Sequence, residues 1–144
     1  MTRRDIVLAL LASARGQAFT PAQLQKAAFL VSENVPELIG EGPAFNFVPY
    51  DYGPFDRSVY DEASALQREG LGDIRPSPWG RWSVYAATAE GIEDGTQLLN
   101  QMDERYRKYV CDTAEWVRSQ SFGGLVKSIY QAYPAMRANS IFKD

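Results

Sequence analysis

The N-terminal segment alternates apolar and polar residues with the period of a helix. The apolar positions that share one helical face are Val7, Leu10, Leu11 and Ala14. Thr2 suits the N-cap, Asp5 stands three residues later as in a capping box, and Gly16 suits the end. We therefore predict a first helix from Thr2 to Ala14, with an apolar face broad enough to belong to the core.

A second segment repeats the same start signal. Thr20 is a good N-cap and Pro21 suits the first helical position. The apolar stripe that follows consists of Leu24, Ala27, Ala28 and Val31, widened by Phe29 and Leu30. Val35-Pro36 ends the pattern, so we predict a second helix up to this point and a surface loop over residues 37–44.

Residues 45–70 predict a strand, a rigid turn and a third helix. Phe45, Phe47 and Pro49 alternate with other residues, as in a half-buried strand. Gly53 and Pro54 break this strand, and Pro54 suits the first turn of the helix that follows. In that helix the apolar residues at helical spacing are Val59, Ala63 and Leu66, and Gly70 is the expected C-cap.

The next segment predicts a β-hairpin followed by a helix. Residues 71–76 and 79–85 have the composition of two short strands, with Ser77 and Pro78 at the tip. Thr88 then suits the N-cap of a fourth helix. Two glycines, Gly91 and Gly95, lower the helix propensity of this segment.

Two more helices are predicted near the C-terminus. The first runs from Met102 to Arg118, and the second begins at Ser121 and ends near Tyr133-Pro134. Residues 135–144 are predicted to form an extended or frayed tail, which Ile141 and Phe142 could anchor.

The order helix, helix, strand, helix and hairpin matches the parts of a winged helix. The chain has 144 residues, of which 45% are hydrophobic, enough for one core but too few for two ordinary domains. We predict a mainly helical α+β fold in one domain, residues 1–144. Its winged-helix-like core spans residues 1–87, two to three appended helices occupy residues 88–134, and the tail follows.

The composition removes several classes of chemistry. The chain has no histidine and a single cysteine, so Ser-His-Asp and Cys-His pairs, histidine zinc ligands and disulfides are excluded. Cys111 lies in a helical pattern beside Val110 and is expected to be a buried or half-buried core residue. We therefore predict a protein that is not an enzyme, with no catalytic residue, no metal site and no cofactor.

Charge and hydropathy limit the partners and the location. The net charge of −3 disfavours strong non-specific binding to nucleic acid or anionic lipid. No apolar run reaches the roughly 20 residues that span a bilayer. The basic and then apolar N-terminus resembles a signal peptide only in passing, because Asp5 interrupts it. We expect a cytoplasmic location.

Aromatic residues around the Gly-Pro turn are the leading candidates for contact with a protein partner. Tyrosine combines a large apolar area with a polar tip and is enriched in interface hot spots. The predicted partner-binding residues are Tyr50, Asp51, Tyr52, Phe55 and Trp79. The alternative is structural: the tyrosines pack the turn onto the second helix, and the hairpin tryptophans, Trp79 and Trp82, pack onto Phe45 or Phe47.

DNA binding is the alternative function. In a winged helix the third helix usually enters a groove of DNA while the hairpin straddles the backbone. The possible nucleic-acid contacts are Arg57, Arg68, Arg75 and Arg81. The exposed face of the third helix carries four acidic residues against two arginines, which opposes phosphate binding.

The remaining charged residues have ordinary interpretations. Lys26 is expected to be a solvated surface lysine. It could pair with Asp51 or Asp56, an exposed pair worth ~0 to 1 kcal/mol, and a small anionic-ligand site is the less favoured alternative. The acidic residues near the turn, Asp51, Asp56, Asp61 and Glu62, could act as paired general acids and bases in a hydrolase or nuclease. Without a second motif, a solvated charged face is the favoured interpretation.

Four motifs carry a resemblance to a known family. LQKAAFLV (24–31), FNFVPYDYGPF (45–55), VYDEASALQREG (59–70) and YAATAEG (85–91) resemble, in order and spacing, the motifs of the Panacea domain, also known as the SocA-like or GepA-type phage-associated domain, and of the related YwgA-like proteins. The matching residues are Leu24, Lys26, Phe29, Tyr50, Tyr52, Gly53, Pro54, Phe55, Val59, Tyr60, Leu66 and Gly70.

The resemblance implies a prokaryotic or prophage-encoded antitoxin that neutralises a toxin by direct protein contact, without a cofactor. Two features depart from the family pattern: Ala27 and Ala28 replace bulkier apolar residues, and the C-terminal YPAMRANSIFKD is closer to the YwgA-like branch. A homo-oligomer is also possible, and the appended helices could either form its interface or complete the core.

Overall fold

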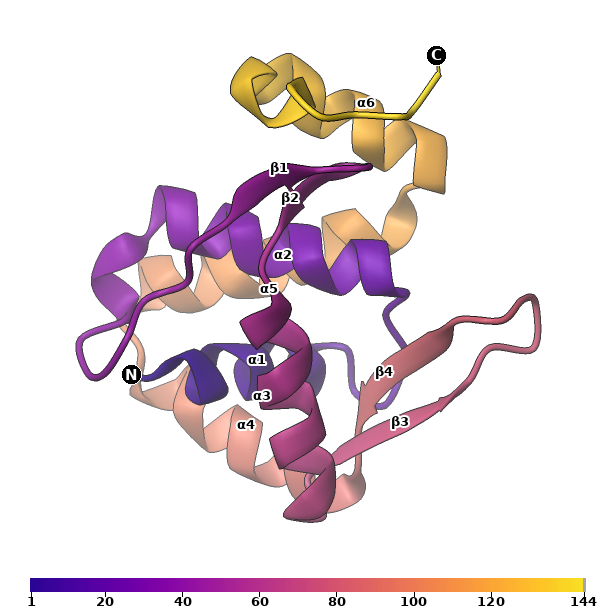
Figure 1. Cartoon of the computed structure of the whole chain (residues 1–144). Coiled ribbons are helices and arrows are strands. Elements are labelled where there is room, and N and C mark those ends of the chain that lie inside the picture. The colour runs from indigo at the N-terminus through magenta and orange to yellow at the C-terminus, as the bar shows by residue number, and fades with distance from the viewer. Residues whose placement is uncertain (144) are drawn as a thin grey trace.

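The computed structural model describes residues 1–143 and shows a mainly helical α+β chain (Figure 1). Over these residues the α-helices are α1 (Arg3–Ser13), α2 (Pro21–Asn34), α3 (Arg57–Arg68), α4 (Ala89–Gln101), α5 (Glu104–Ser119) and α6 (Phe122–Ala132). Two small antiparallel sheets pair β1 (Val48–Tyr50) with β2 (Gly53–Phe55), and β3 (Gly72–Pro76) with β4 (Ser83–Ala87). Short 3-10 helices, η1 (Pro36–Leu38) and η2 (Pro134–Arg137), complete the elements.

The predicted starts of α1, α2, α4 and α6 are confirmed, and local capping fixes them. Thr2 Oγ1 accepts from the backbone N–H of Asp5 at 3.2 Å, and the Asp5 carboxylate accepts from the Thr2 N–H at 3.0 Å. Thr20 forms the same reciprocal pair with Gln23, which the sequence analysis did not single out. The predicted N-caps Thr88 and Ser121 likewise accept from backbone N–H groups of α4 and α6.

The predicted helix ends are close to those observed. α1 ends at Ser13, one residue before the predicted Ala14, and α5 spans Glu104–Ser119 where Met102 to Arg118 was predicted. α3 ends at Arg68, and Gly70 has φ +79°, a left-handed conformation that glycine adopts readily after a helix.

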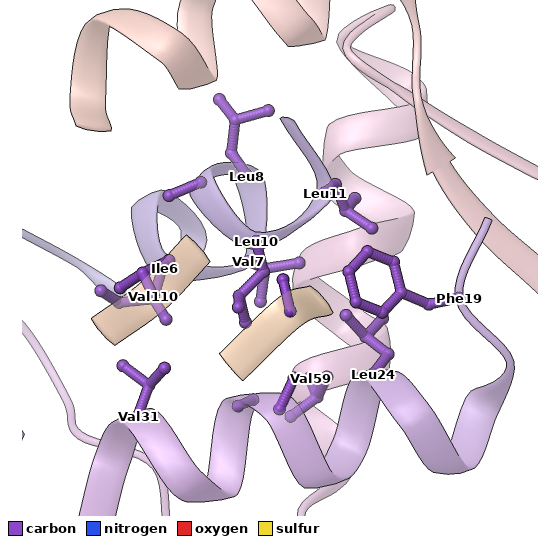
Figure 2. Packing of buried hydrophobic residues seen from close by; sticks show 14 of the residues in the cluster. Ile6, Val7, Leu8, Leu10, Leu11, Phe19, Leu24, Val31, Val59 and Val110 are labelled. Carbon is purple, nitrogen blue, oxygen red and sulfur yellow. The ribbon is translucent and has the colours of Figure 1, made fainter. Parts of the chain in front are cut away.

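α1 is the centre of the core. Every residue from Ile6 to Ala12 is buried, because α2, α3, α4 and α5 surround this helix. Figure 2 shows its side chains meeting Leu24 and Val31 of α2, Val59 of α3 and Val110 of α5. The buried cluster includes residues from all six helices, so the C-terminal helices complete the core.

The two glycines of α4 mark where this helix approaches its neighbours closely. A Cβ atom on Gly95 would lie 2.3 Å from the Cβ of Ala12 in α1, and one on Gly91 would lie 1.9 Å from the carbonyl oxygen of Leu71. Both positions therefore exclude a larger side chain. The glycines that lower helix propensity are the residues that let α4 pack against α1.

The predicted single strand before α3 is wrong. Residues 48–55 instead form a two-stranded hairpin, in which Pro49 faces Pro54 and Tyr50 faces Gly53. Pro54 therefore lies in β2 and not in the first turn of α3, which begins at Arg57 after the N-cap Asp56. The reason is the turn: Gly53 has φ +112°, so the chain reverses at residues 51 and 52 and the second proline pairs across the hairpin.

The second hairpin is confirmed, with a longer tip than predicted. β3 and β4 enclose residues 77–82, so Trp79 and Trp82 lie outside the strands. Figure 1 shows this tip projecting beyond the helices. Phe19, in the α1–α2 connection, exchanges two backbone hydrogen bonds of 2.8 and 2.9 Å with Tyr85 of β4 and thus adds a third extended segment beside the hairpin.

The C-terminal segment is more ordered than a frayed tail. It forms η2 and then crosses the β1–β2 hairpin, where the N–H of Ile141 donates to the carbonyl oxygen of Asp51 at 2.9 Å. The side chain of Asn139 donates to the carbonyl oxygen of Pro49 at 3.2 Å. The predicted anchoring by Ile141 thus takes place through its backbone, and Phe142 lies 6.2 Å from Phe122, ring to ring. Asp144, the last residue of the predicted tail, lies outside the described residues.

Candidate functional site

A groove with a volume of about 840 Å³ lies between α2, the β1–β2 hairpin and the start of α6. We call it the aromatic groove. Its lining residues are Thr20, Pro21, Ala22, Gln23, Gln25, Lys26, Tyr50, Asp51, Tyr52, Gly53, Pro54, Phe55, Tyr60, Trp82, Gln120, Phe122 and Leu125. The lining is mostly apolar. It combines residues from the segments 20–26, 50–55 and 120–125 with Tyr60 of α3 and Trp82 of the β3–β4 tip.

Large aromatic side chains form the rim of the aromatic groove and remain open to solvent. Tyr50 is 53% exposed, Phe122 48% and Trp82 45%. Tyr50 stacks on Phe55 with ring centroids 4.9 Å apart, and Tyr52 makes an edge contact of 5.1 Å with Phe122. Ring contacts thus hold Tyr50 and Phe122 in place while leaving area for a partner.

Gln25 joins α2 to the hairpin and α3. Its side-chain amide donates to the carbonyl oxygen of Asp56 at 2.8 Å and accepts from the Asp56 N–H at 3.0 Å. The Asp56 carboxylate in turn accepts from the N–H groups of Ser58 and Asn46, at 2.8 and 2.6 Å. These four bonds fix the hairpin and the start of α3 on α2, and so define one wall of the aromatic groove.

Lys26 lies in the aromatic groove and is almost completely buried, with 2% of its surface exposed. An added Cβ on Gly53 would lie 3.7 Å from its Nζ, so the ammonium group packs against the β1–β2 turn. Burial lowers the pKa of Lys26 to about 8. The expectation of a solvated surface lysine is wrong because the β1–β2 hairpin covers this face of α2.

The expected partners of Lys26 do not pair with it. Within residues 1–143 its ammonium group has no hydrogen bond and no ion pair. Asp56 is occupied by backbone N–H groups, and these bonds lower its pKa although burial opposes them. Asp51 lines the aromatic groove, and the tail residues Ile141 and Ser140 donate hydrogen bonds to its backbone carbonyl oxygen. A buried cation is thus left without a counter-ion in the described part of the chain.

The structure brings four of the five predicted partner-binding residues together. Tyr50, Asp51, Tyr52 and Phe55 all line the aromatic groove. Over residues 1–143 the hydroxyls of Tyr50 and Tyr52 do not make the internal hydrogen bond that a purely structural role predicts. Trp79 lies apart at the hairpin tip, where it is 87% exposed.

The predicted packing of Trp79 or Trp82 onto Phe45 or Phe47 is wrong. The two phenylalanines contact each other, and Phe47 contacts Phe29. Trp82 instead contributes to the aromatic groove.

Three contributors to this groove were not predicted from the sequence: Lys26 as a buried group, Trp82 and Phe122. Phe122 is the first residue of α6, and its side chain reaches past the core to Tyr52. Its position directly after an N-cap was the available signal, since a helix terminus lies at the edge of the packed face.

None of the four arginines proposed for nucleic acid lines the aromatic groove. Arg57 of α3 lies 3.8 Å from the Asp61 carboxylate, and Arg75 of β3 lies 2.9 Å from that of Asp73. Arg68 and Arg81 are exposed. The acidic residues of α3 are partly neutralised as well, because Glu62 and Glu69 pair with Arg3 and Arg4 of α1.

The described residues also bear on metal binding, on the cysteine and on a membrane span. Over residues 1–143 no three Cys, Asp or Glu side chains gather as metal ligands would. Cys111 is half-buried, as predicted, and burial raises the pKa of its thiol. In the same part of the chain no helix is both long and apolar enough to cross a bilayer.

Comparison with models of protein families gives no match to this chain, and no curated protein matches its sequence. The resemblance to the Panacea family therefore stays a prediction that rests on the four motifs.

Proposed function

We propose that this protein is a non-enzymatic interaction module whose aromatic groove binds a segment of a partner protein. The observation that carries the proposal is the rim of the groove, where partly exposed aromatic side chains from the β1–β2 hairpin, the β3–β4 hairpin and α6 surround one apolar volume. Aromatic anchors at the centre of an interface provide most of the binding energy. An exposed apolar surface of this kind favours a protein partner over solvent.

The motifs suggest which kind of partner this is. Tyr50, Tyr52, Gly53 and Phe55 belong to the motif that resembles the Panacea antitoxins, and the same residues line the aromatic groove. We propose an antitoxin-like role in the cytoplasm, in which the groove holds a partner toxin encoded by a neighbouring or prophage gene.

We also propose a winged-helix-like core over residues 1–87. The bridge between Phe19 and Tyr85 supports it, because it adds an extended segment between α1 and α2 to the β3–β4 hairpin. The β1–β2 hairpin then stands as an insertion between the second and third helices of that core. The insertion provides the tyrosines of the aromatic groove.

The size of the groove indicates how it is used. A specific interface buries about 800 Å² per partner. We infer that the groove, which holds one segment of the partner, supplies the central hot spot of such an interface, and that the exposed Trp79 extends the contact along the hairpin tip.

Affinity capture from the source cells tests the proposal. Tagged wild-type protein is captured with nuclease present, washed at moderate salt and analysed by mass spectrometry beside two variants, Tyr52→Ala and Trp116→Ala. Trp116 is 37% exposed on α5 and does not line the groove, so it serves as the matched control. We expect one stoichiometric protein, retained by Trp116→Ala and lost by Tyr52→Ala.

Two results would contradict the proposal. One is the capture of no protein partner together with specific DNA when nuclease is omitted, which would favour the winged-helix regulator. The other is equal capture of a partner by folded Tyr52→Ala, which would place the interface elsewhere.

A further inference from the structure

The aromatic groove contains a cation without a counter-ion. Lys26 lines the groove, and only 2% of its surface is exposed. Within residues 1–143 it makes no hydrogen bond and no ion pair. Its Nζ keeps some contact with water in the groove, since among the described residues only Arg118 Nε is a fully buried side-chain nitrogen or oxygen without a hydrogen-bond partner. A charge that is largely withdrawn from water without a partner still carries much of the cost of desolvation, which is why buried charges in proteins are normally paired. The position of Lys26 therefore favours a ligand that brings the missing negative charge.

We propose that the aromatic groove binds a carboxylate carried on an apolar group, that Lys26 is its counter-ion, and that the partner segment supplies this carboxylate. That the occupant is a segment of a partner protein rests on the proposed function. That the occupant carries a negative charge rests only on the position of the Lys26 ammonium. An acidic side chain or a chain terminus next to apolar residues has the required chemistry.

The groove fits a single carboxylate better than a phosphate group. Phosphate recognition uses several cations or a guanidinium fork, whereas Lys26 is the only cationic side chain that lines the groove among the described residues. The carboxylate of Asp51 also lines the groove and opposes a ligand of higher negative charge. The other titratable groups that line it are tyrosines: Tyr50, Tyr52 and Tyr60.

The walls select the group that carries the carboxylate. Phe55, Phe122 and Leu125 are apolar, and the volume of about 840 Å³ lies in the range of roughly 300–1,000 Å³ typical of ligand sites. An aromatic or aliphatic group next to the carboxylate would fill this volume. A strongly polar carrier would lose its hydration there without finding partners.

Simple acids and their amides test the chemistry without the partner. The probes are 3-phenylpropionate and 4-phenylbutyrate, each compared with its primary amide, and binding is followed by NMR of the labelled protein. We expect both acids to bind about tenfold or more tightly than the amides, with shifts in residues of the groove. Lys26→Met should abolish this preference, and Lys127→Met, at an exposed lysine of α6, should keep it.

The titration of Lys26 itself gives a second readout in the wild-type protein. A carboxylate beside the ammonium favours its charged form, so each acid should raise the pKa of Lys26 and the matching amide should not. Equal affinities of acids and amides, or an unchanged pKa of Lys26 in the presence of bound acid, would overturn the inference.

The captured partner tests who supplies the carboxylate. We expect Lys26→Met to lose most of the partner that wild type and Lys127→Met retain. Full capture by Lys26→Met would overturn the assignment of the carboxylate to the partner while leaving the proposed function intact. Selective binding of the acids with no partner captured would overturn that same assignment together with the proposed function, and would point to a free organic acid as the ligand.

Discussion

Replacing Lys26 by methionine should stabilise the protein, although it removes a residue of a family-like motif. Methionine keeps the length of the buried stem and removes the desolvated ammonium group. Burial lowers the pKa of Lys26 from 10.5 to about 8. Each pKa unit corresponds to about 1.4 kcal/mol, so the charged form costs the native state roughly 3 kcal/mol at neutral pH. For a chain of this size, that amount would raise Tm by about 10 °C.

The pH dependence has a definite sign. Because the pKa of Lys26 is lower in the native state, the unfolded chain binds more protons between about pH 8 and pH 10.5. Wild type therefore gains stability relative to Lys26→Met as the pH rises through this window. The gap, meaning the difference in the free energy of unfolding between the two proteins, is widest below pH 8. Burial also raises the pKa of Tyr60, to about 12, and that of Tyr85, which lowers stability at high pH in both proteins.

Urea unfolding at a series of pH values from 7 to 10.5 measures the gap. Tryptophan fluorescence follows the transition for wild type, Lys26→Met and Lys127→Met, and the last should match wild type because Lys127 is exposed. A Lys26→Met protein that is less stable than wild type at pH 7, or a gap that does not close with rising pH, would refute the assignment of a buried, unpaired ammonium.

Three further outcomes follow from the packing and the surfaces. Gly95→Ala should destabilise the protein by about 1–3 kcal/mol in urea unfolding, because the added Cβ meets Ala12; a gain in stability, as helix propensity alone would give, would contradict the close packing of α4 on α1. Tyr52→Ala and Trp79→Ala should weaken capture of the partner while leaving the circular dichroism spectrum unchanged, and loss of folding would assign either residue to the core. Duplex DNA should bind weakly, and a steep salt dependence that disappears in Arg57→Ala/Arg75→Ala would instead support a regulator.

Local signals in the sequence were sufficient for the helices. N-caps such as Thr2 and Thr88 form bonds within three residues, so their effect does not depend on the rest of the fold. Most of the helical positions predicted to be buried, among them Leu24 and Leu66, are buried, whereas Leu30 is only half-buried. The hairpin after α3 was also recognisable, because two β-prone runs flank a proline-containing tip.

The β1–β2 hairpin was missed because its local signals are ambiguous. Pro54 suits the first turn of a helix as well as it suits a short edge strand. The choice is made by contacts distant in sequence: Gln25 of α2 holds the backbone of Asp56, and the tail holds the turn through Asp51. No periodicity within residues 45–56 contains this information.

The burial of Lys26 was hidden for the same reason. On α2 alone Lys26 lies beside the apolar stripe, where a lysine is usually solvated. The missing hairpin is the element that covers it, since the ammonium packs against Gly53. Because the β1–β2 hairpin was not predicted, Lys26 was expected to be exposed to solvent. The glycines of α4 show the same limit, because only the position of α1 turns them from weak helix formers into packing contacts.

If Lys26 is buried at a cost and serves as the counter-ion of a ligand, its replacement should change stability and binding in opposite directions. A residue kept only for packing would lose stability and binding together when it is replaced. A buried ammonium that awaits a carboxylate costs stability in the free protein and recovers this cost when the ligand pairs with it. Lys26→Met should therefore unfold at a higher urea concentration than wild type and yet bind the acids, and the partner, more weakly. Parallel changes in stability and binding would show that Lys26 is a structural residue.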